Sequence, residues 1–295
     1  METKYSQDYT LAELMAVAAS REIQDKENVF IGIGVPLMAG LLAKNTHAPN
    51  ITLIYESGCV GPLQQRISYN VGDSSCTDEA VYLTSQWRIF SDLQKGYIDV
   101  GLLGGAQIDK YGNMNTTTIF GVGTYEKPQA RLPGSGGGND IGSSAKRTVF
   151  VMSLEKRRFL PRVDYITTPG YLDGGSSREK AGLLGKGPVS VITNKCILKF
   201  DEDTKEMYLE SLHPKVTIDE VKQEITWDIN VAPELKITEP PTVQQVKIIR
   251  DIDPSGIILG VEAAISDIKD FSMWADITEN SIKKMREMNK RELNQ

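Results

Sequence analysis

Glu56 stands directly after an apolar run, residues 51–55, whose composition is typical of a strand buried on both faces. An ionised carboxylate beside buried backbone is costly unless it is paired or used in chemistry. Ligands of open α/β sheets bind at the carboxyl ends of the strands. Glu56 is therefore a candidate nucleophile. The tripeptide Glu-Ser-Gly by itself favours a purely structural role, a strand-end carboxylate that caps a turn or a following helix.

A second chemically suggestive segment is Gly-Ile-Gly-Val-Pro at residues 32–36, after a predicted strand that begins at Asn28. It lacks the third glycine of a dinucleotide fingerprint, because Leu37 occupies that position. One interpretation is a tight turn from strand to helix. The other is that the glycines let a substrate approach the backbone, so that N–H groups near Gly34 and Val35 bind a developing oxyanion.

The most glycine-dense segment is residues 134–140, which lacks the Gly-Lys-Ser/Thr ending of a phosphate-binding loop. Two interpretations stay open here, a flexible surface loop and a narrow passage for an extended substrate. Cys59 is close to Glu56 in the chain, but a small core residue is the stronger interpretation because no histidine neighbours it. His47 and His213 lie in polar stretches, so both are expected to be exposed.

The elements that must position these residues alternate between strands and helices. A capping box at Thr10 predicts a helix over residues 11–24, and the same pattern at Thr217 and Thr242 predicts two more. Further helices are expected at 37–44 and 83–95. One strand is expected to run from Asn28 into the glycine-containing turn that ends at Pro36, and others are expected at 51–55, 98–104, 148–153, 164–168 and 189–193, with a hairpin at 197–209. This order predicts an α/β fold with a largely parallel sheet flanked by helices.

Composition narrows the function classes. The 295 residues carry a formal net charge of -6, with 40% hydrophobic and 24% charged residues, which is ordinary for a globular protein. We expect no nucleic-acid partner, which would call for a basic surface, and no membrane span, which needs about 20 apolar residues. Three scattered cysteines and two histidines predict no metal site and favour the reducing cytoplasm.

The ordered set of motifs resembles family I coenzyme A transferases, and within them the B subunits of the glutaconate CoA-transferase type. The resemblance spans roughly residues 8–255 and rests on residues 32–36, 56–58, 104–109, 111–113, 134–138, 155–159 and 197–200. It implies a fold of the NagB/RpiA-like type. It also implies an organisation of one α/β domain, residues 1–257, followed by a C-terminal helical extension, residues 258–295.

The resemblance further implies that Glu56 is the catalytic nucleophile. It would carry coenzyme A as a glutamyl thioester between an acyl-CoA and a carboxylic acid, with dicarboxylic acids among the candidates. The residues implied to bind CoA or substrate are Gly32, Ser57, Gly58, Gly136, Gly137, Gly138 and Asn139. No permanently bound cofactor is implied, since coenzyme A is a substrate carrier. The partner implied is the A subunit of a CoA-transferase, a separate polypeptide, which gives a hetero-oligomer.

Alternative functions remain open on the same scaffold. Relatives of this family include hydrolases and decarboxylases of CoA esters, and a third possibility is a CoA-binding subunit whose partner performs the chemistry. Retention of a glutamate at position 56 favours the transferase. The segments 59–72 and 74–87 depart from the glutaconate pattern, so the sequence leaves the acid undetermined.

Overall fold

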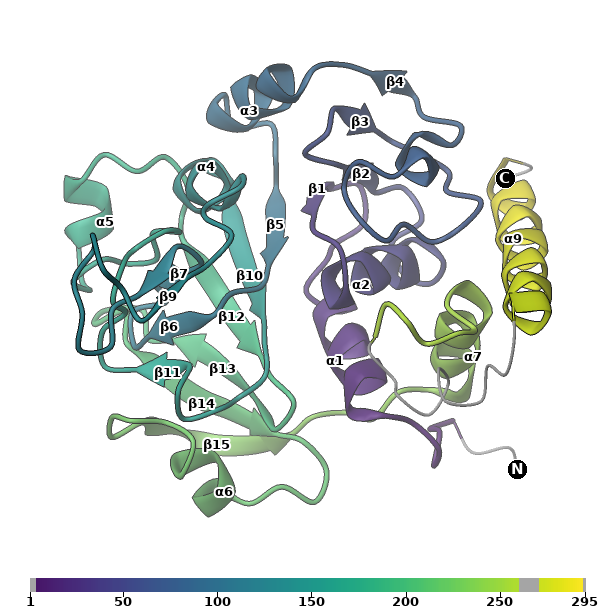
Figure 1. Cartoon of the computed structure of the whole chain (residues 1–295). Helices are drawn as coiled ribbons and strands as arrows, with labels where there is room; N and C mark the ends of the chain where they lie inside the picture. Colours follow the sequence, from purple (N-terminus) through teal and green to yellow (C-terminus); the bar gives the residue numbers. More distant parts are fainter. Residues whose placement is uncertain (1–3, 260–270, 294–295) are drawn as a thin grey trace. The chain divides into compact units, whose positions relative to one another are not determined.

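The computed structural model describes residues 4–259 and 271–293. The chain divides into two compact units, and each is described by itself. The Glu56 unit comprises residues 1–89 and 240–295, and the glycine-loop unit comprises residues 90–239. Figure 1 labels the elements of both.

The Glu56 unit contains these elements: α1 (Leu11–Ser20), β1 (Asn28–Ile31), α2 (Val35–Lys44), β2 (Thr52–Ile54), β3 (Cys59–Val60), the 3-10 helix η1 (Ser74–Thr77), β4 (Tyr82–Leu83), α7 (Val243–Ile252) and α9 (Phe271–Leu293). The chain passes to the other unit within α3 (Gln86–Gln94). There it forms β5 (Val100–Leu103), β6 (Gln107–Asp109), β7 (Met114–Asn115), β8 (Thr118–Ile119), β9 (Ala130–Arg131), α4 (Gly138–Ser144), β10 (Arg147–Val151), β11 (Phe159–Leu160), α5 (Ser177–Lys180), β12 (Pro188–Ile192), β13 (Cys196–Phe200), β14 (Met207–Leu212), α6 (Ile218–Lys222) and β15 (Asn230–Ile237).

In the Glu56 unit, β1 and β2 are parallel neighbours, with Phe30 opposite Ile54. The two antiparallel strands β3 and β4 follow beyond β2, so β4 lies at an edge. Helices α1 and α2 pack against each other, and α7 packs against α9. Because β1 and β2 are parallel and in register, the segments that leave their carboxyl ends emerge at the same edge of the sheet.

The predicted capping boxes are present at all three helix starts. The Thr10 hydroxyl accepts from the Glu13 N–H, and the Glu13 carboxylate accepts from the Thr10 N–H; Thr217 and Thr242 begin α6 and α7 in the same way. Helix α1 ends at Ser20, earlier than the predicted residue 24. The next residues form turns that bring the chain into β1.

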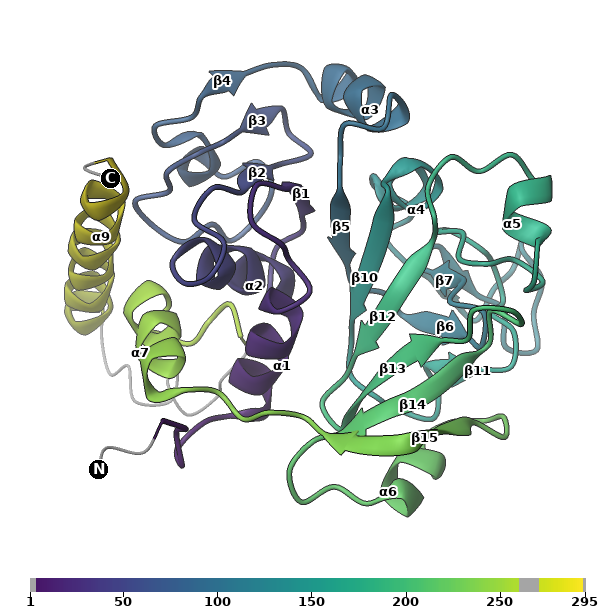
Figure 2. The same cartoon turned by 180° about the vertical axis from the view of Figure 1, so that it is seen from behind.

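The glycine-loop unit is built on a sheet in the order β5-β10-β12-β13-β14-β15 (Figure 2). Strands β5, β10 and β12 are parallel, whereas β12-β13 and β13-β14 are antiparallel. The β13-β14 pair is the hairpin predicted at residues 197–209. The predicted α/β class with largely parallel strands and flanking helices is confirmed.

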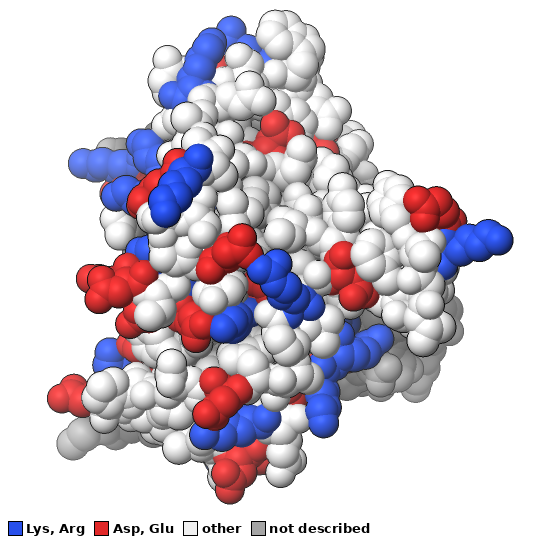
Figure 3. Space-filling view, turned by 90° about the vertical axis from the view of Figure 1, so that its left-hand side faces the viewer, with Lys and Arg blue, Asp and Glu red and all other residues white. Residues whose placement is uncertain are grey.

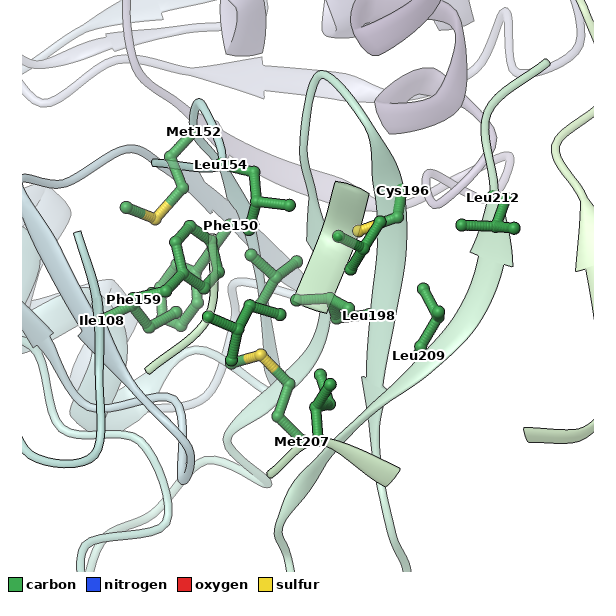
Figure 4. Close-up of a cluster of buried hydrophobic side chains, with 14 of the residues drawn as sticks. Ile108, Phe150, Met152, Leu154, Phe159, Cys196, Leu198, Met207, Leu209 and Leu212 are labelled. Atoms are coloured by element: carbon green, nitrogen blue, oxygen red, sulfur yellow. The ribbon is translucent and has the colours of Figure 1, made fainter. Parts of the chain in front are cut away.

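One hydrophobic cluster fills the glycine-loop unit between its main sheet, the small sheet β11-β6-β7 and the segment around α6 (Figure 4). Its buried members are Ile108, Met114, Phe150, Met152, Leu154, Phe159, Val191, Cys196, Leu198, Met207, Leu209, Leu212, Val221, Ile225 and Ile229. Met207 and Leu209 of β14 show how a period of two places one strand face in this core, and this alternation of core residues ends after Leu209, where the pairing register with β15 shifts.

The predicted strand at 164–168 is wrong. Apart from an isolated bridge between Met114 and Thr168, this segment forms no ladder in the described structure. The Asp164 carboxylate instead accepts from the Gln107 amide and from the Phe120 N–H. Side-chain hydrogen bonds therefore replace strand pairing at one end, and Pro169, which has no N–H, follows at the other.

The prediction that both histidines are exposed is wrong for His213, which is buried. Its Nε2 is 2.7 Å from the Thr193 carbonyl oxygen and its Nδ1 is 3.0 Å from Thr238 Oγ1. Burial lowers the pKa of His213, against an opposing hydrogen bond to Thr193. Polar neighbours in sequence did not reveal that Thr193 and Thr238 would enclose this ring.

The C-terminal segment contains the predicted helix, since α9 spans Phe271–Leu293. Residues 260–270 of the predicted extension lie outside the described residues. The division between residues 257 and 258 therefore stays a prediction.

Candidate active site

Glu56 lies on a tight turn at the carboxyl end of β2. The Gly58 N–H donates to the Tyr55 carbonyl at 3.0 Å, and the Tyr55 N–H donates to the Cys59 carbonyl at 2.9 Å. Glu56 and Ser57 occupy the two central positions, and Ser57 is exposed. Gly58 has a φ of 113°, and a Cβ placed there would be 1.9 Å from the Thr84 carbonyl oxygen. The turn therefore requires glycine at position 58.

The Glu56 side chain is half-buried, and its hydrogen-bond partner is an amide. Gln86 Nε2, at the start of α3, donates to Glu56 Oε1 at 3.0 Å. An amide donor orients a carboxylate without neutralising it, so the second oxygen can still act as a nucleophile. The sequence pattern did not reveal Gln86, because nothing in the chain links a residue so far downstream to the β2 turn.

The Gly32–Gly34 segment leaves β1 beside the Glu56 turn, as the β1-β2 pairing requires. Gly34 has a φ of 89° and is the N-cap of α2, without a side-chain cap. The first intrahelical bond of α2 runs from the Met38 N–H to the Gly34 carbonyl. Val35 is the first residue of α2, so its N–H has no intrahelical acceptor, and the next residue, Pro36, has no N–H at all. This geometry suits binding of negative charge.

A buried network of polar side chains connects Tyr55, the residue before Glu56, to the loop that follows β3. The Tyr55 hydroxyl donates to Gln64 Oε1 at 2.5 Å, and Gln64 Nε2 donates to Ser68 Oγ at 2.5 Å. Ser68 Oγ lies 2.6 Å from Ser75 Oγ. All four side chains are buried, so the residue before Glu56 is tied to the loop that follows β3.

Cys59 belongs to this supported region, but it is not a competing nucleophile. Its thiol is buried and donates to the Cys76 carbonyl at 2.6 Å. Burial raises the pKa of Cys59 to about 11, with smaller contributions from Cys76 and Asp78. A thiol protonated at neutral pH is a poor nucleophile, so the interpretation of Cys59 as a core residue is favoured.

The glycine loop lies in the other unit and is more regular than the sequence suggested. Gly136 has a φ of 47°, Gly137 is the N-cap of α4, and Gly138 and Asn139 begin that helix. A Cβ on Gly138 would be 2.7 Å from Thr168 Oγ1. Glycine at position 138 therefore lets α4 lie directly against the segment before Pro169.

Arg178, a residue that no sequence motif singled out, fixes the far end of α4. Its guanidinium is buried and donates to the carbonyls of Gly142, Ser143, Pro169, Gly170 and Gly185 at 2.6–3.3 Å. Burial lowers the pKa of Arg178 to about 10. One side chain thus joins three backbone segments that surround the glycine loop's helix. A charged residue in a Ser-Ser-Arg-Glu-Lys stretch gives no sequence signal of this role.

The structure brings together some of the predicted site residues within the Glu56 unit: Gly32, Gly34, Val35, Glu56, Ser57 and Gly58 follow the carboxyl ends of β1 and β2. It places Gly136, Gly137, Gly138 and Asn139 together at the start of α4. On the face of the molecule in Figure 3, acidic and basic side chains are intermingled. No helix of the described residues is long and apolar enough to cross a bilayer. Within the same residues, no group of three or more His, Cys, Asp or Glu side chains is arranged to hold a metal ion.

Sequence comparison identifies a family and two relatives. Residues 12–224 match the family model described as Coenzyme A transferase. The chain is 39% identical over 246 residues to the B subunit of 3-oxoadipate CoA-transferase from Pseudomonas knackmussii, covering 83% of this chain and 94% of the relative. It is 37% identical over 262 residues to the B subunit of glutaconate CoA-transferase from Acidaminococcus fermentans, covering 86% and 96%.

Structural comparison agrees. The crystal structure of glutaconate coenzyme A-transferase from Acidaminococcus fermentans superimposes with a TM-score of 0.80 and 35% identity, covering 87% of this chain and 99% of that chain. The decarboxylase AibA/AibB superimposes with a TM-score of 0.73 at 23% identity, over 85% and 98% of the two chains. The second match shows a shared fold alone.

Proposed function

Because this chain belongs to the coenzyme A transferase family, we propose that it is the B subunit of a transferase that moves coenzyme A from an acyl-CoA to a carboxylic acid, with Glu56 as its covalent nucleophile. The observation that carries the proposal is the Glu56 turn. It presents a half-buried carboxylate at a strand end that accepts a hydrogen bond from the Gln86 amide and, within residues 4–259 and 271–293, forms no salt bridge with a lysine or arginine. A carboxylate is ordinarily ionised at neutral pH, so this nucleophile needs no partner base.

The proposed reaction conserves the thioester through two anhydrides. A Glu56 oxygen attacks the acyl-CoA carbonyl carbon and the carbon–sulfur bond breaks. CoA departs as a thiolate, and the acyl group remains on Glu56 as a mixed anhydride. The thiolate attacks the Glu56 carbonyl carbon, which forms glutamyl-CoA and releases the donor acid as a carboxylate. The acceptor carboxylate then attacks glutamyl-CoA, forming a second anhydride and thiolate. Attack of that thiolate on the acceptor's carbonyl yields the new acyl-CoA and regenerates Glu56.

Each addition develops charge on a carbonyl oxygen. We assign the backbone N–H groups of Gly34 and Val35 to that oxygen, because they stand at the uncapped start of α2 beside the Glu56 turn. One such donor is typically worth about 3–4 kcal/mol in the transition state. Gly32, Ser57 and Gly58 complete the backbone surface around the reacting carbons.

We assign CoA binding to the glycine loop, at Gly136, Gly137, Gly138 and Asn139, where the absence of side chains permits an extended ligand to approach the backbone. No cofactor other than the CoA carrier enters this chemistry. The relatives named above act, by their names, with 3-oxoadipate and glutaconate. Both are dicarboxylates, which supports a dicarboxylic acid as one substrate. The three unpaired cysteines, all buried, support a cytoplasmic location.

The proposed partner is a separate polypeptide, the A subunit of the same transferase, since both relatives are named as B subunits. The structure offers a surface for such a contact on and after the edge strand β4. Val81, Leu83 and Trp87 expose 76%, 61% and 71% of their surface, and Tyr82 is also exposed. An apolar strip of this kind on an edge strand is a liability unless another protein covers it.

The direct test is mass spectrometry of the assembled hetero-oligomer after incubation with acyl-CoA. We expect a CoA adduct on the peptide that contains Glu56. Glu56→Gln and Glu56→Ala should abolish both the adduct and turnover, whereas Glu202→Gln, an exposed control in the β13-β14 turn, should change neither. Full turnover in Glu56→Ala without an adduct in the wild type would reject the proposal.

The alternative reaction class is the one that the sequence left open, a hydrolase or decarboxylase of CoA esters. If the enzyme were a hydrolase or decarboxylase of CoA esters, acyl-CoA supplied without an acceptor acid would be consumed over many turnovers. The transferase should instead stop after one equivalent of glutamyl-CoA, because water is a poor substitute for the acceptor in a shielded site. A non-catalytic CoA-binding subunit would retain turnover in Glu56→Gln.

A further inference from the structure

Helix α9 lies in the C-terminal segment and is anchored at its centre to α7. Ser281 Oγ donates to the Ile252 carbonyl at 2.8 Å, and Lys284 Nζ lies 2.5 Å from Asp251 Oδ1. Burial acts to raise the pKa of Asp251, but hydrogen bonds from Lys247 and Lys284 together hold that pKa below its ordinary value. Asp251 is thus ionised and paired with a lysine from each helix.

The side of α9 that faces the protein follows helical spacing. Ser281 and Met285 are buried, four residues apart, and Asn289 continues the row one turn later. Lys283 and Glu287 are exposed on the other side. Figure 1 shows α9 running beside α7 towards the segment that joins β3 to β4.

The last turns of α9 bind the loop that follows β3. Asn289 Nδ2 donates to the Leu63 and Gln64 carbonyls, each at 3.0 Å. Arg286 Nε donates to Gln65 Oε1 at 2.6 Å. The Asn289 amide has two hydrogens, so both are used in holding successive peptide groups of one loop.

That loop is the one that supports the candidate nucleophile. Gln64, whose backbone carbonyl accepts from Asn289, has a buried side chain that accepts from the Tyr55 hydroxyl at 2.5 Å. Tyr55 is the residue before Glu56, and its carbonyl closes the Glu56 turn through the Gly58 N–H. A continuous set of hydrogen bonds therefore runs from α9 through Gln64 to the turn.

We infer that α9 is a brace for the Glu56 turn, in the sense that it holds the loop on which the turn rests, and that Asn289 is a positioning residue for the reaction. The inference rests on the proposed role of Glu56. By holding two carbonyls of residues 63–64, Asn289 fixes the backbone from which Gln64 reaches Tyr55. A loop without this brace would leave the Gln64 side chain and the Tyr55 ring free to shift, and the Glu56 carboxylate would shift with them.

The test compares Asn289→Ala with Lys283→Ala, an exposed position on the same helix, in the assembled enzyme. Hydrogen exchange of residues 61–80 should rise about tenfold in Asn289→Ala, as expected for the loss of the two hydrogen bonds. The kcat should fall by about 10- to 100-fold through misplacement of the nucleophile, with KM for acyl-CoA nearly unchanged. Asn289→Asp, which keeps the size but replaces donors with a repelling carboxylate, should have an equal or larger effect. Lys283→Ala should behave as wild type.

Three outcomes would overturn the inference that α9 positions the Glu56 turn. They are unchanged exchange in both Asn289 variants, faster exchange with an unchanged kcat, and a fall in kcat matched by an equal loss of folded protein. Failure of the proposed function is distinguishable from these. It appears as full activity in Glu56→Gln, whereas the exchange measurement reports on the loop whatever Glu56 does.

Discussion

The Glu56 turn and the glycine loop are held in place by different means. Hydrogen bonds between buried side chains, from Tyr55 to Gln64 and from Gln64 to Ser68, fix the backbone of the Glu56 turn. Around the loop's helix α4, one guanidinium binds five carbonyls, and Gly138 is packed too closely for a side chain. Both regions also contain a glycine that is packed too closely for a Cβ, Gly58 in the turn and Gly138 in α4, so they differ in whether a series of side chains or a single guanidinium fixes the backbone. The comparison predicts different responses to substitution.

The largest effect is expected from Arg178→Met. Removing the guanidinium leaves several buried carbonyls without donors, at about 1–3 kcal/mol for each group that water cannot reach. We expect a loss of at least about 3 kcal/mol in the free energy of unfolding, measured with urea. Arg178→Lys should recover part of it, because an ammonium keeps the charge but not the fork. Arg162→Met, at an exposed ion pair with Asp173, should cost less than about 1 kcal/mol. Equal costs at the two arginines would refute the role given to Arg178.

The next effect is expected from Gly58→Ala in the Glu56 turn. The added Cβ would lie 1.9 Å from the Thr84 carbonyl oxygen at a φ of 113°, so the backbone must move. We expect a loss of about 2–3 kcal/mol in the free energy of unfolding and a large fall in kcat. Gly96→Ala is the matched control, because its φ is also positive, at 78°, but its Cβ would meet nothing within 4 Å. Gly96→Ala should cost about 1–2 kcal/mol and leave kcat unchanged.

A smaller effect is expected at the glycine loop. Gly138→Ala places a Cβ 2.7 Å from Thr168 Oγ1, and a cost of about 1–3 kcal/mol should follow from overpacking, together with a higher KM for acyl-CoA. Adding Thr168→Ala should relieve the contact. A double-mutant cycle on thermal unfolding measures this coupling, and strict additivity would mean that the two residues do not restrain each other.

The smallest effect concerns His213 and pH. Its pKa in the folded protein is lowered below the ordinary value of 6.5, so the unfolded chain binds the proton more readily. His213 therefore favours folding above pH 6.5, and this contribution is lost as pH falls through the lowered pKa. Thermal unfolding midpoints should decline less steeply below pH 6.5 in His213→Gln than in the wild type. Parallel declines would show that other groups control the acid response.

Local pattern predicted most of the fold. The capping boxes at Thr10, Thr217 and Thr242 depend only on residues three apart, and each helix begins there. Buried strands such as β10 were found because their apolar runs are contiguous. The motif order predicted the coenzyme A transferase family, and the comparisons confirm it. The predicted strand at 164–168 was wrong because hydrogen bonds from Gln107 and Phe120, distant in sequence, engage Asp164.

The sequence by itself determined the candidates for chemistry: a glutamate after a buried strand, and glycines at two turns. Only the tertiary structure decided which groups surround them. Gln86, Arg178 and Asn289 reach partners as far as 30, 36 and 226 residues away, respectively. Their donors are ordinary polar groups whose meaning depends on which carbonyl or carboxylate the folded backbone brings within about 3 Å, and no local spacing encodes that.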